Sequence, residues 1–255
     1  VLLFLMGIGP LLSWNYTSQS VLLNRFKLPF STSFVSGIGY IIFSSSFQLY
    51  VFVAIMGVSF TLSSILGEFY KSYKKQKRAS NFFDALIRMF LSNRHQNGGY
   101  IVHIGIVLLF IGFIGRAFEV EKEFSLSPGE QIYFSNYVFK LNSIKSEARD
   151  NHYAFLSEID VVDSSTNQLI VNLKPEKRIY FYWNSDPEKR QPHSELDIYS
   201  TIQKDIYSIF SGYDAQKNIG YFKIMINPLV NWVWIGGVLM VIGSLFAFWP
   251  SRRDN

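Results

Sequence analysis

Nitrogen and sulfur side chains that could ligate a metal are few in this sequence. It contains four histidines and no cysteine, which excludes disulfides, thiolate metal sites and a cysteine nucleophile. It also lacks an HExxH zinc motif, a Walker phosphate-binding loop and a GxSxG nucleophile elbow, so the common hydrolase, zinc-enzyme and nucleotide-binding classes have no support. Any redox role must therefore use a bound cofactor.

His103 is the strongest candidate because it lies in the apolar segment GGYIVHIGIVLLFIGFIG, about one turn inside a predicted membrane-spanning helix. An ionisable side chain there is costly, so a functional role is the default expectation. The imidazole could hydrogen-bond a neighbouring helix, relay protons or ligate a metal such as haem iron. Gly105, Gly112 and Gly115 fall on a face roughly opposite His103 and predict a close-packing seam, with the histidine pointing into a separate cavity.

The other histidines have a simpler interpretation. His95 lies in a basic loop, while His152 and His193 lie in polar stretches further along the chain. Polar loop residues are usually solvated, so all three are expected to be surface residues.

Two further clusters have both a functional and a structural interpretation. Trp232 and Trp234 could pack around a cofactor. Their place at the start of an apolar run favours the alternative that they are anchors at the membrane interface. A charged cluster beside Pro175 is most simply a solvated turn. Its members are Lys174, Glu176, Lys177 and Arg178.

Membrane-spanning helices must position His103, because several apolar runs approach the length of about 20 residues that crosses a bilayer. Residues 1–67 are predicted to hold about three spans. The first is the truncated tail of a helix interrupted at Gly9-Pro10, and the others lie near 31–46 and 48–67 with a turn around Ser44-Ser45-Ser46. Two more spans are predicted at 98–118 and 227–250. With no initiator Met or signal peptide, the sequence is expected to start within a longer protein.

Basic residues predict the orientation of these spans. The loop 68–97 is rich in Lys and Arg, with seven of them between Lys71 and Arg94 against one acid, Asp84, which marks the cytoplasmic side. Within it, NFFDALIRMFL predicts an amphipathic interfacial helix that ends at Gly98-Gly99. The tail 251–255 carries two arginines and is expected on the same side. Residues 119–226 are therefore predicted to lie opposite, in the periplasm of a bacterium.

Residues 119–226 have the pattern of a β domain. Segments such as YVFKLNSI, QLIVNL and RIYFYW alternate, with turn signals between them, which predicts a small barrel or sandwich. The segment SELDIYSTIQKDIYSIFSG fits either strand–turn–strand or a short helix. The net charge of +5 is attributed to membrane topology, and no nucleic-acid partner is expected. The predicted fold class is an α-helical polytopic membrane protein with an inserted extracytoplasmic all-β domain.

Three segments in order resemble the C-terminal part of the cytochrome c-type biogenesis protein CcmF family, related to NrfE: MGIGPLLSW, GGYIVHIGIVLLFIGFIG and NPLVNWVWIGGVLMVIGSLFAFWP. LKPEKRIYFY and DIYSTIQKDIY lie between them. The resemblance implies a membrane subunit of the haem lyase that attaches haem to apocytochrome c on the outer face of the membrane. It implies as partners haem, apocytochrome c, membrane lipid, other maturation proteins and the upstream half of the same subunit.

The resemblance also implies that His103 is an axial ligand of haem b, because the family has a transmembrane histidine at this place. In the family, the second axial ligand, the external haem-binding histidines and a Trp-rich segment lie upstream, so this chain is expected to be incomplete as a lyase. The implied location is the bacterial inner membrane, or alternatively the mitochondrial inner membrane. Two other hypotheses stay open: a non-enzymatic assembly scaffold in which His103 only packs, and an unrelated transporter or sensor.

Overall fold

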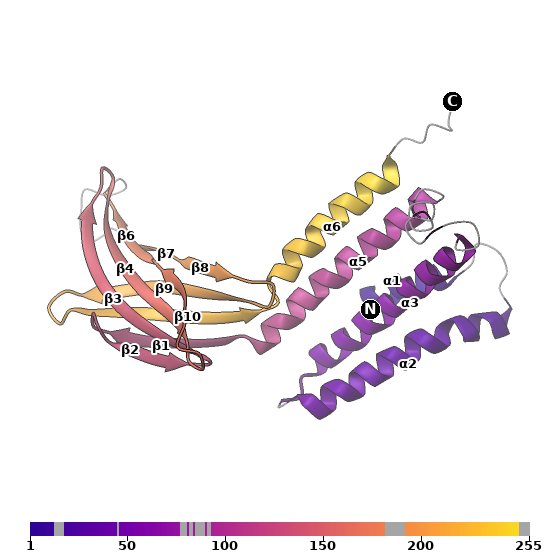
Figure 1. Cartoon of the computed structure of the whole chain (residues 1–255), viewed down its shortest axis with the longest axis horizontal. Helices are drawn as coiled ribbons and strands as arrows, with labels where there is room; N and C mark the ends of the chain where they lie inside the picture. The colour runs from indigo at the N-terminus through magenta and orange to yellow at the C-terminus, as the bar shows by residue number, and fades with distance from the viewer. Residues whose placement is uncertain are drawn as a thin grey trace. The chain divides into compact units, whose positions relative to one another are not determined.

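The computed structural model describes residues 1–12, 18–44, 46–76, 81, 84, 90, 93–181 and 192–249 of the chain. They form two compact units, one made of Val1–Ala117 with Leu229–Asn255 and the other of Phe118–Pro228. The first unit is helical and the second is all β (Figure 1). This confirms the predicted fold class, a helical membrane protein with an inserted β domain.

The helical unit contains α1 (Leu2–Ile8), α2 (Gln19–Phe43), α3 (Leu49–Gln76), α5 (Arg94–Gly115) and α6 (Asn231–Phe248). Four of these helices, α2, α3, α5 and α6, are long and apolar enough to cross a membrane. Large apolar side chains point outward from them, as shown by Phe34 at 64% and Val238 at 59% exposure. A helix that is apolar on its outer side suits lipid rather than water as its surroundings.

The α2 helix begins at Gln19 rather than near residue 31, and it includes Pro29. Proline removes one backbone hydrogen bond, here the one that would run to the carbonyl of Arg25 four residues earlier. The hydroxyls of Ser31 and Thr32 donate to the carbonyls of Lys27 and Leu28 at 2.7 and 3.1 Å, so these side chains satisfy their hydroxyl groups within the apolar helix. The predicted turn between the two helices is confirmed, because α2 ends at Phe43 and α3 begins at Leu49.

The α5 helix corrects the prediction that Gly98-Gly99 ends a helix, because it begins at Arg94 and runs through both glycines. A Cβ atom added at Gly98 would lie 2.6 Å from the Cβ of Ala247 in α6. Glycine is therefore required here for close helix packing and not for termination. Most of the predicted amphipathic helix in NFFDALIRMFL, and the whole tail 251–255, lie outside the described residues.

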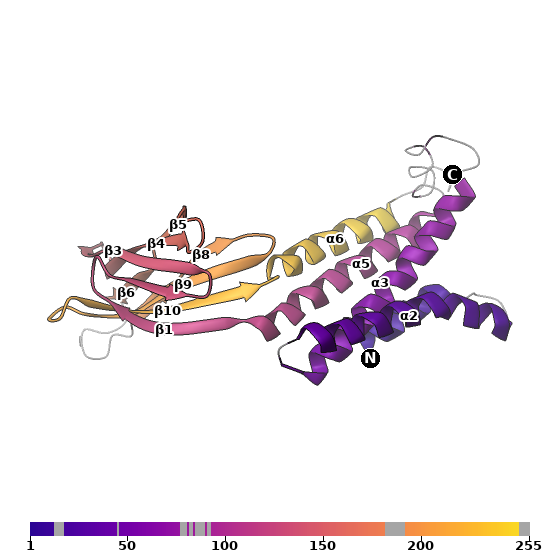
Figure 2. The ribbon, with the colours of Figure 1, turned by 60° about the horizontal axis from the view of Figure 1, so that its bottom comes forward.

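The β unit is a sandwich of two antiparallel sheets (Figure 2). One sheet has the strand order β1-β10-β9-β8, and the other has β2-β3-β4-β6-β7 with β5 paired to β4. The first sheet comprises β1 (Val120–Leu126), β8 (Asp197–Ser200), β9 (Lys204–Asp214) and β10 (Ile219–Pro228). The second comprises β2 (Gln131–Phe134), β3 (Tyr137–Ala148), β4 (His152–Asp163), β5 (Leu169–Leu173), β6 (Glu176–Tyr180) and β7 (Pro192–Glu195).

The core of the sandwich follows from the two-residue period of its strands. In β10, Phe222, Ile224 and Ile226 are buried, while Tyr221, directly before Phe222, is exposed. The ring of Phe222 stacks on Phe210 of β9 with centroids 4.8 Å apart, in one buried cluster with side chains of β3, β4 and β5. The ambiguous segment SELDIYSTIQKDIYSIFSG forms the end of β7, all of β8, a turn and most of β9, so strand–turn–strand is the correct alternative.

Candidate functional site

A glycine seam between α5 and α6 positions the helix that carries His103. A Cβ atom added at Gly105 would lie 2.7 Å from the carbonyl oxygen of Gly236, and one at Gly112 would lie 2.4 Å from a methyl of Val233. Only glycine permits this approach of two backbones. The predicted seam is confirmed at Gly105 and Gly112, and its partner is α6, which lies alongside α5 in both views (Figures 1 and 2).

His103 lies on the side of α5 away from this seam, since two residues of an α-helix separate it from Gly105 by about 200°. Its imidazole is partly buried, and its Nδ1 lies 2.6 Å from the carbonyl oxygen of Gly99 one turn earlier. A carbonyl only accepts hydrogen bonds, so Nδ1 carries a proton, and in the neutral ring the lone pair is on Nε2. Metal-ligating histidines commonly use this tautomer, in which one nitrogen donates to a carbonyl and the other binds the metal.

The neighbours of His103 on the same face pack toward α1 and α3. Tyr100, three residues earlier, places its ring edge-on against Phe69 of α3 with centroids 5.3 Å apart. Val107, four residues later, is fully buried in a cluster with Leu3 of α1. Residues three and four apart share one face of a helix, so His103 lies between these two contacts on the face turned to α1 and α3.

The donor set fits a single axial ligand and not a complete protein-built metal site. Within the described ranges, no group of three or more His, Cys, Asp or Glu residues could hold a metal ion. His95 is the other histidine of the helical unit, and it is exposed in the first turns of α5. At the depth of His103, the helical unit therefore offers one imidazole, with its tautomer set by Gly99.

The β unit overturns the expectation that His152 is a surface residue, whereas His95 and His193 are exposed as expected. His152 is only 7% exposed, because Tyr180 on the paired strand β6 covers its ring with centroids 4.9 Å apart. Its Nδ1 lies 2.6 Å from Oδ1 of Asn151, and its Nε2 has no partner among the described residues. The polar sequence around His152 misled because burial comes from another strand.

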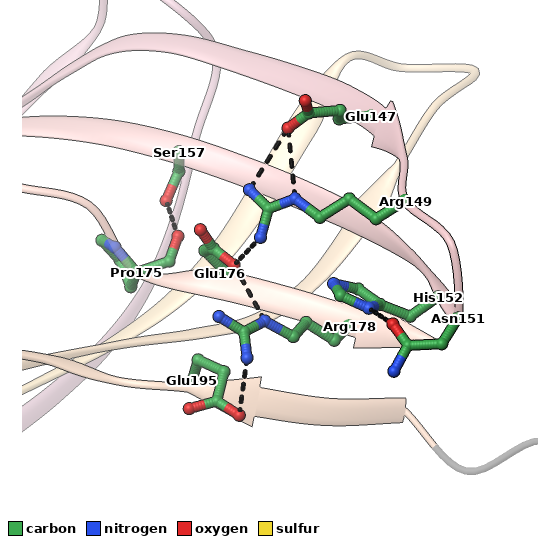
Figure 3. A network of polar contacts seen from close by, with 9 residues as sticks. All are labelled: Glu147, Arg149, Asn151, His152, Ser157, Pro175, Glu176, Arg178 and Glu195. Atoms are coloured by element: carbon green, nitrogen blue, oxygen red, sulfur yellow. Dashed lines mark hydrogen bonds and ion pairs between the residues drawn. The ribbon is translucent and has the colours of Figure 1, made fainter. Parts of the chain in front are cut away.

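The charged cluster beside Pro175 is also not a solvated turn, since Glu176 and Arg178 lie in strand β6. Glu176 accepts from Arg149 at 3.5 Å and from Arg178 at 2.9 Å, and Arg178 reaches Glu195 of β7 at 3.3 Å. Figure 3 shows these side chains and their contacts. Glu176 and Arg178 become partly buried because β6 pairs with β4 and β7. Partly exposed ion pairs contribute about 0–1 kcal/mol each, so the network supports strand pairing and is not a reactive centre.

The paired tryptophans lie in the first turn of α6. Trp234 is 71% exposed, and the backbone N–H of Trp232 donates to the carbonyl of Leu229 at 3.1 Å. An indole that is exposed at the end of an apolar helix has the placement of an interfacial anchor. The structure favours this role for Trp234 over packing around a cofactor.

Sequence reasoning missed the α6 half of the glycine seam. A Cβ atom at Gly236 would lie 2.5 Å from the Gly105 carbonyl oxygen, and one at Gly243 would lie 2.8 Å from the Val102 nitrogen. The signal was present, because Gly236 and Gly243 are seven residues apart, the same spacing that separates Gly105 from Gly112. Two helices with small residues at a shared spacing are natural partners in a membrane.

Comparison with known proteins matches both units. Residues 117–228 match the family described as CcmF C-terminal beta-sandwich. The chain is 23% identical over 249 residues to the cytochrome c-type biogenesis protein CcmF of Haemophilus influenzae, covering 97% of this chain and 36% of that protein. It is 25% identical to the probable cytochrome c-type biogenesis protein NrfE of Escherichia coli K12, covering 64% of this chain and 28% of that protein.

A solved structure shows the same fold. The structure named cytochrome c heme lyase CcmF superposes with a TM-score of 0.72 at 19% identity, covering 97% of this chain and 38% of that chain. The similarity therefore includes the helices as well as the sandwich. The chain spans no more than 38% of the length of these relatives.

Proposed function

We propose that this chain corresponds to the C-terminal part of a cytochrome c-type biogenesis protein of the CcmF/NrfE type, and that it is a membrane part of a haem lyase in cytochrome c maturation. The support is a match over 97% of the chain to a CcmF protein and to a structure named as a heme lyase. Haem and apocytochrome c are the proposed partners, together with the rest of the subunit. Such a broad match argues against an unrelated transporter or sensor.

Within this function, we propose that His103 is an axial ligand of a b-type haem. The observation that carries the proposal is the hydrogen bond from Nδ1 to the Gly99 carbonyl oxygen, which orients the ring and leaves Nε2 to coordinate iron. When bound, a b-type haem would supply one-electron chemistry suited to keeping the delivered haem iron reduced. The glycine seam contributes by turning His103 away from α6.

The test is the visible absorption spectrum of detergent-purified protein, co-expressed with the upstream part of a CcmF-type subunit. His95→Ala is the matched control, because His95 is an exposed histidine on the same helix. We expect a reduced b-type spectrum in the native chain and in His95→Ala, and its loss in His103→Ala. Full haem content in His103→Ala, or no haem in any form, would favour the scaffold hypothesis in which His103 only packs.

We also propose that the protein lies in a bacterial inner membrane with the β sandwich in the periplasm. The relatives are bacterial proteins. The chain enters the sandwich after α5 and leaves it into α6. Basic residues mark the opposite ends of these two helices: Arg94 is the first residue of α5, and Arg252-Arg253 follow α6 in the sequence. Basic flanks tend to stay on the cytoplasmic side, which supports a location of the inserted domain on the other side.

A further inference from the structure

The helical unit contains a polar cavity that the haem proposal does not use. It has a volume of about 900 Å³ and lies where the first turns of α2 and α5 meet the last turns of α3. Three basic side chains line it, Arg25 from α2 and Lys71 and Lys74 from α3, against one acid, Glu68. The cavity is therefore built to receive a negatively charged group.

The three basic side chains of the cavity differ in the contacts that they already make. The Nζ atom of Lys71 lies 2.7 Å from the Glu68 carboxylate, so this pair cancels. One guanidinium nitrogen of Arg25 donates to the carbonyl oxygen of Leu11 at 3.0 Å, which holds the group at the edge of the cavity. Lys74 is exposed and has no carboxylate within ion-pair distance in the described part of the chain. Its ammonium group is thus available to a ligand.

A neutral donor completes the lining. Gln96 donates to the hydroxyl oxygen of Tyr100 at 2.7 Å, and both residues border the cavity. Because this hydroxyl oxygen acts as an acceptor toward Gln96, its own proton remains to be donated. A ligand in the cavity would thus meet two kinds of donor, cationic groups and a hydroxyl, which is the combination that suits phosphate oxygens.

The position of the cavity identifies the source of the phosphate. It lies at the ends of three apolar helices, and basic pockets between spanning helices near the membrane surface recognise anionic lipid headgroups. Further along α2, Leu28 and Phe30 are 57% and 58% exposed, an apolar surface suited to acyl chains. We propose that this cavity binds the phosphate of an anionic phospholipid, held by Arg25, Lys74 and Tyr100, with the acyl chains along α2.

The experiment is native mass spectrometry of the purified chain in detergent, equilibrated with phosphatidylglycerol or with phosphatidylcholine. The variants are Lys74→Gln and Arg25→Gln, and the matched control is Lys27→Gln, an exposed cation on α2 that does not line the cavity. We expect phosphatidylglycerol to be retained by the native chain and by Lys27→Gln. Retention should fall about fivefold in Lys74→Gln, the scale of one basic group near an anionic surface.

Three results would overturn the proposal. An equal loss in Lys27→Gln would mean that surface charge alone attracts the lipid. Equal retention of phosphatidylcholine would mean that the phosphate is not recognised through its net negative charge, and displacement by inorganic phosphate at millimolar concentration would indicate a free-phosphate site. Arg25→Gln also removes the hydrogen bond to the Leu11 carbonyl oxygen and could unfold the chain for that reason. In that case the result for Lys74→Gln alone tests the proposal. Lipid retention should be unchanged in His103→Ala, which separates this proposal from the haem proposal.

Discussion

Two imidazoles of this chain have similar hydrogen bonds but different access. Nδ1 of His103 faces the Gly99 carbonyl oxygen, and Nδ1 of His152 faces the Asn151 side-chain oxygen, both at 2.6 Å. In each ring Nε2 is the nitrogen left for another partner. His152 is 7% exposed under Tyr180, so nothing large can reach it, whereas His103 is only partly buried. Access therefore makes His103 the better candidate for a haem ligand.

The turn between β4 and β5 provides a prediction for a single carboxylate. The Ser165 hydroxyl and then the backbone N–H groups of Thr166 and Ser165 donate to Asp163, which lowers its pKa from 3.8 to about 2. A lowered carboxyl pKa stabilises the folded state above the unfolded pKa, and this stabilisation is lost as pH falls from 3.8 to about 2. We expect Asp163→Asn to reduce the loss of thermal stability across this window.

The measurement is thermal unfolding of the detergent-solubilised chain at a series of pH values. Ser165→Ala provides a second variant, because it removes the first donor while keeping the carboxylate. It should shift the loss of stability toward higher pH, since the pKa of Asp163 would move back toward its ordinary value. If both variants follow the native pH profile, the turn hydrogen bonds contribute no stability.

At the scale of elements, the glycine seam gives the sharpest prediction. A Cβ atom at Gly236 would lie 2.5 Å from the Gly105 carbonyl oxygen, whereas one at the adjacent Gly237 would have no atom within 4 Å. Overpacking of this kind costs about 1–3 kcal/mol. We expect Gly236→Ala to destabilise the helical unit by that amount, and Gly237→Ala to stay within about 0.5 kcal/mol of the native chain.

Unfolding of the purified chain by detergent titration would measure both variants side by side. The two substitutions are chemically identical and one residue apart, so differences in expression or hydrophobicity do not separate them. A further expectation is that Gly236→Ala weakens haem retention, because the seam orients the face that carries His103. Equal stability of the two variants would contradict the close approach of α5 and α6.

At the scale of the whole molecule, the absence of cysteine makes the proposed topology directly testable. Lys217 is exposed in the turn between β9 and β10, and Lys74 is exposed near the end of α3. We expect a membrane-impermeant maleimide to label Lys217→Cys in cells whose outer membrane alone is permeabilised, because the β sandwich is proposed to be periplasmic. Lys74→Cys should be labelled only after the inner membrane is opened. The reverse pattern would invert the proposed orientation.

The sequence by itself determined the fold class, because the length of apolar runs and the two-residue alternation of strands are local properties of the chain. The same local periodicity placed Gly105 and Gly112 opposite His103. Gly236 and Gly243 share the seven-residue spacing of Gly105 and Gly112, but a shared spacing does not say which helix faces meet, so only the tertiary structure identified α6 as the other half of the seam. It also showed that Tyr180 buries His152, that Glu176 and Arg178 lie in a strand, and that α2, α3 and α5 together line a basic cavity. Each of these depends on contacts between residues far apart in the chain.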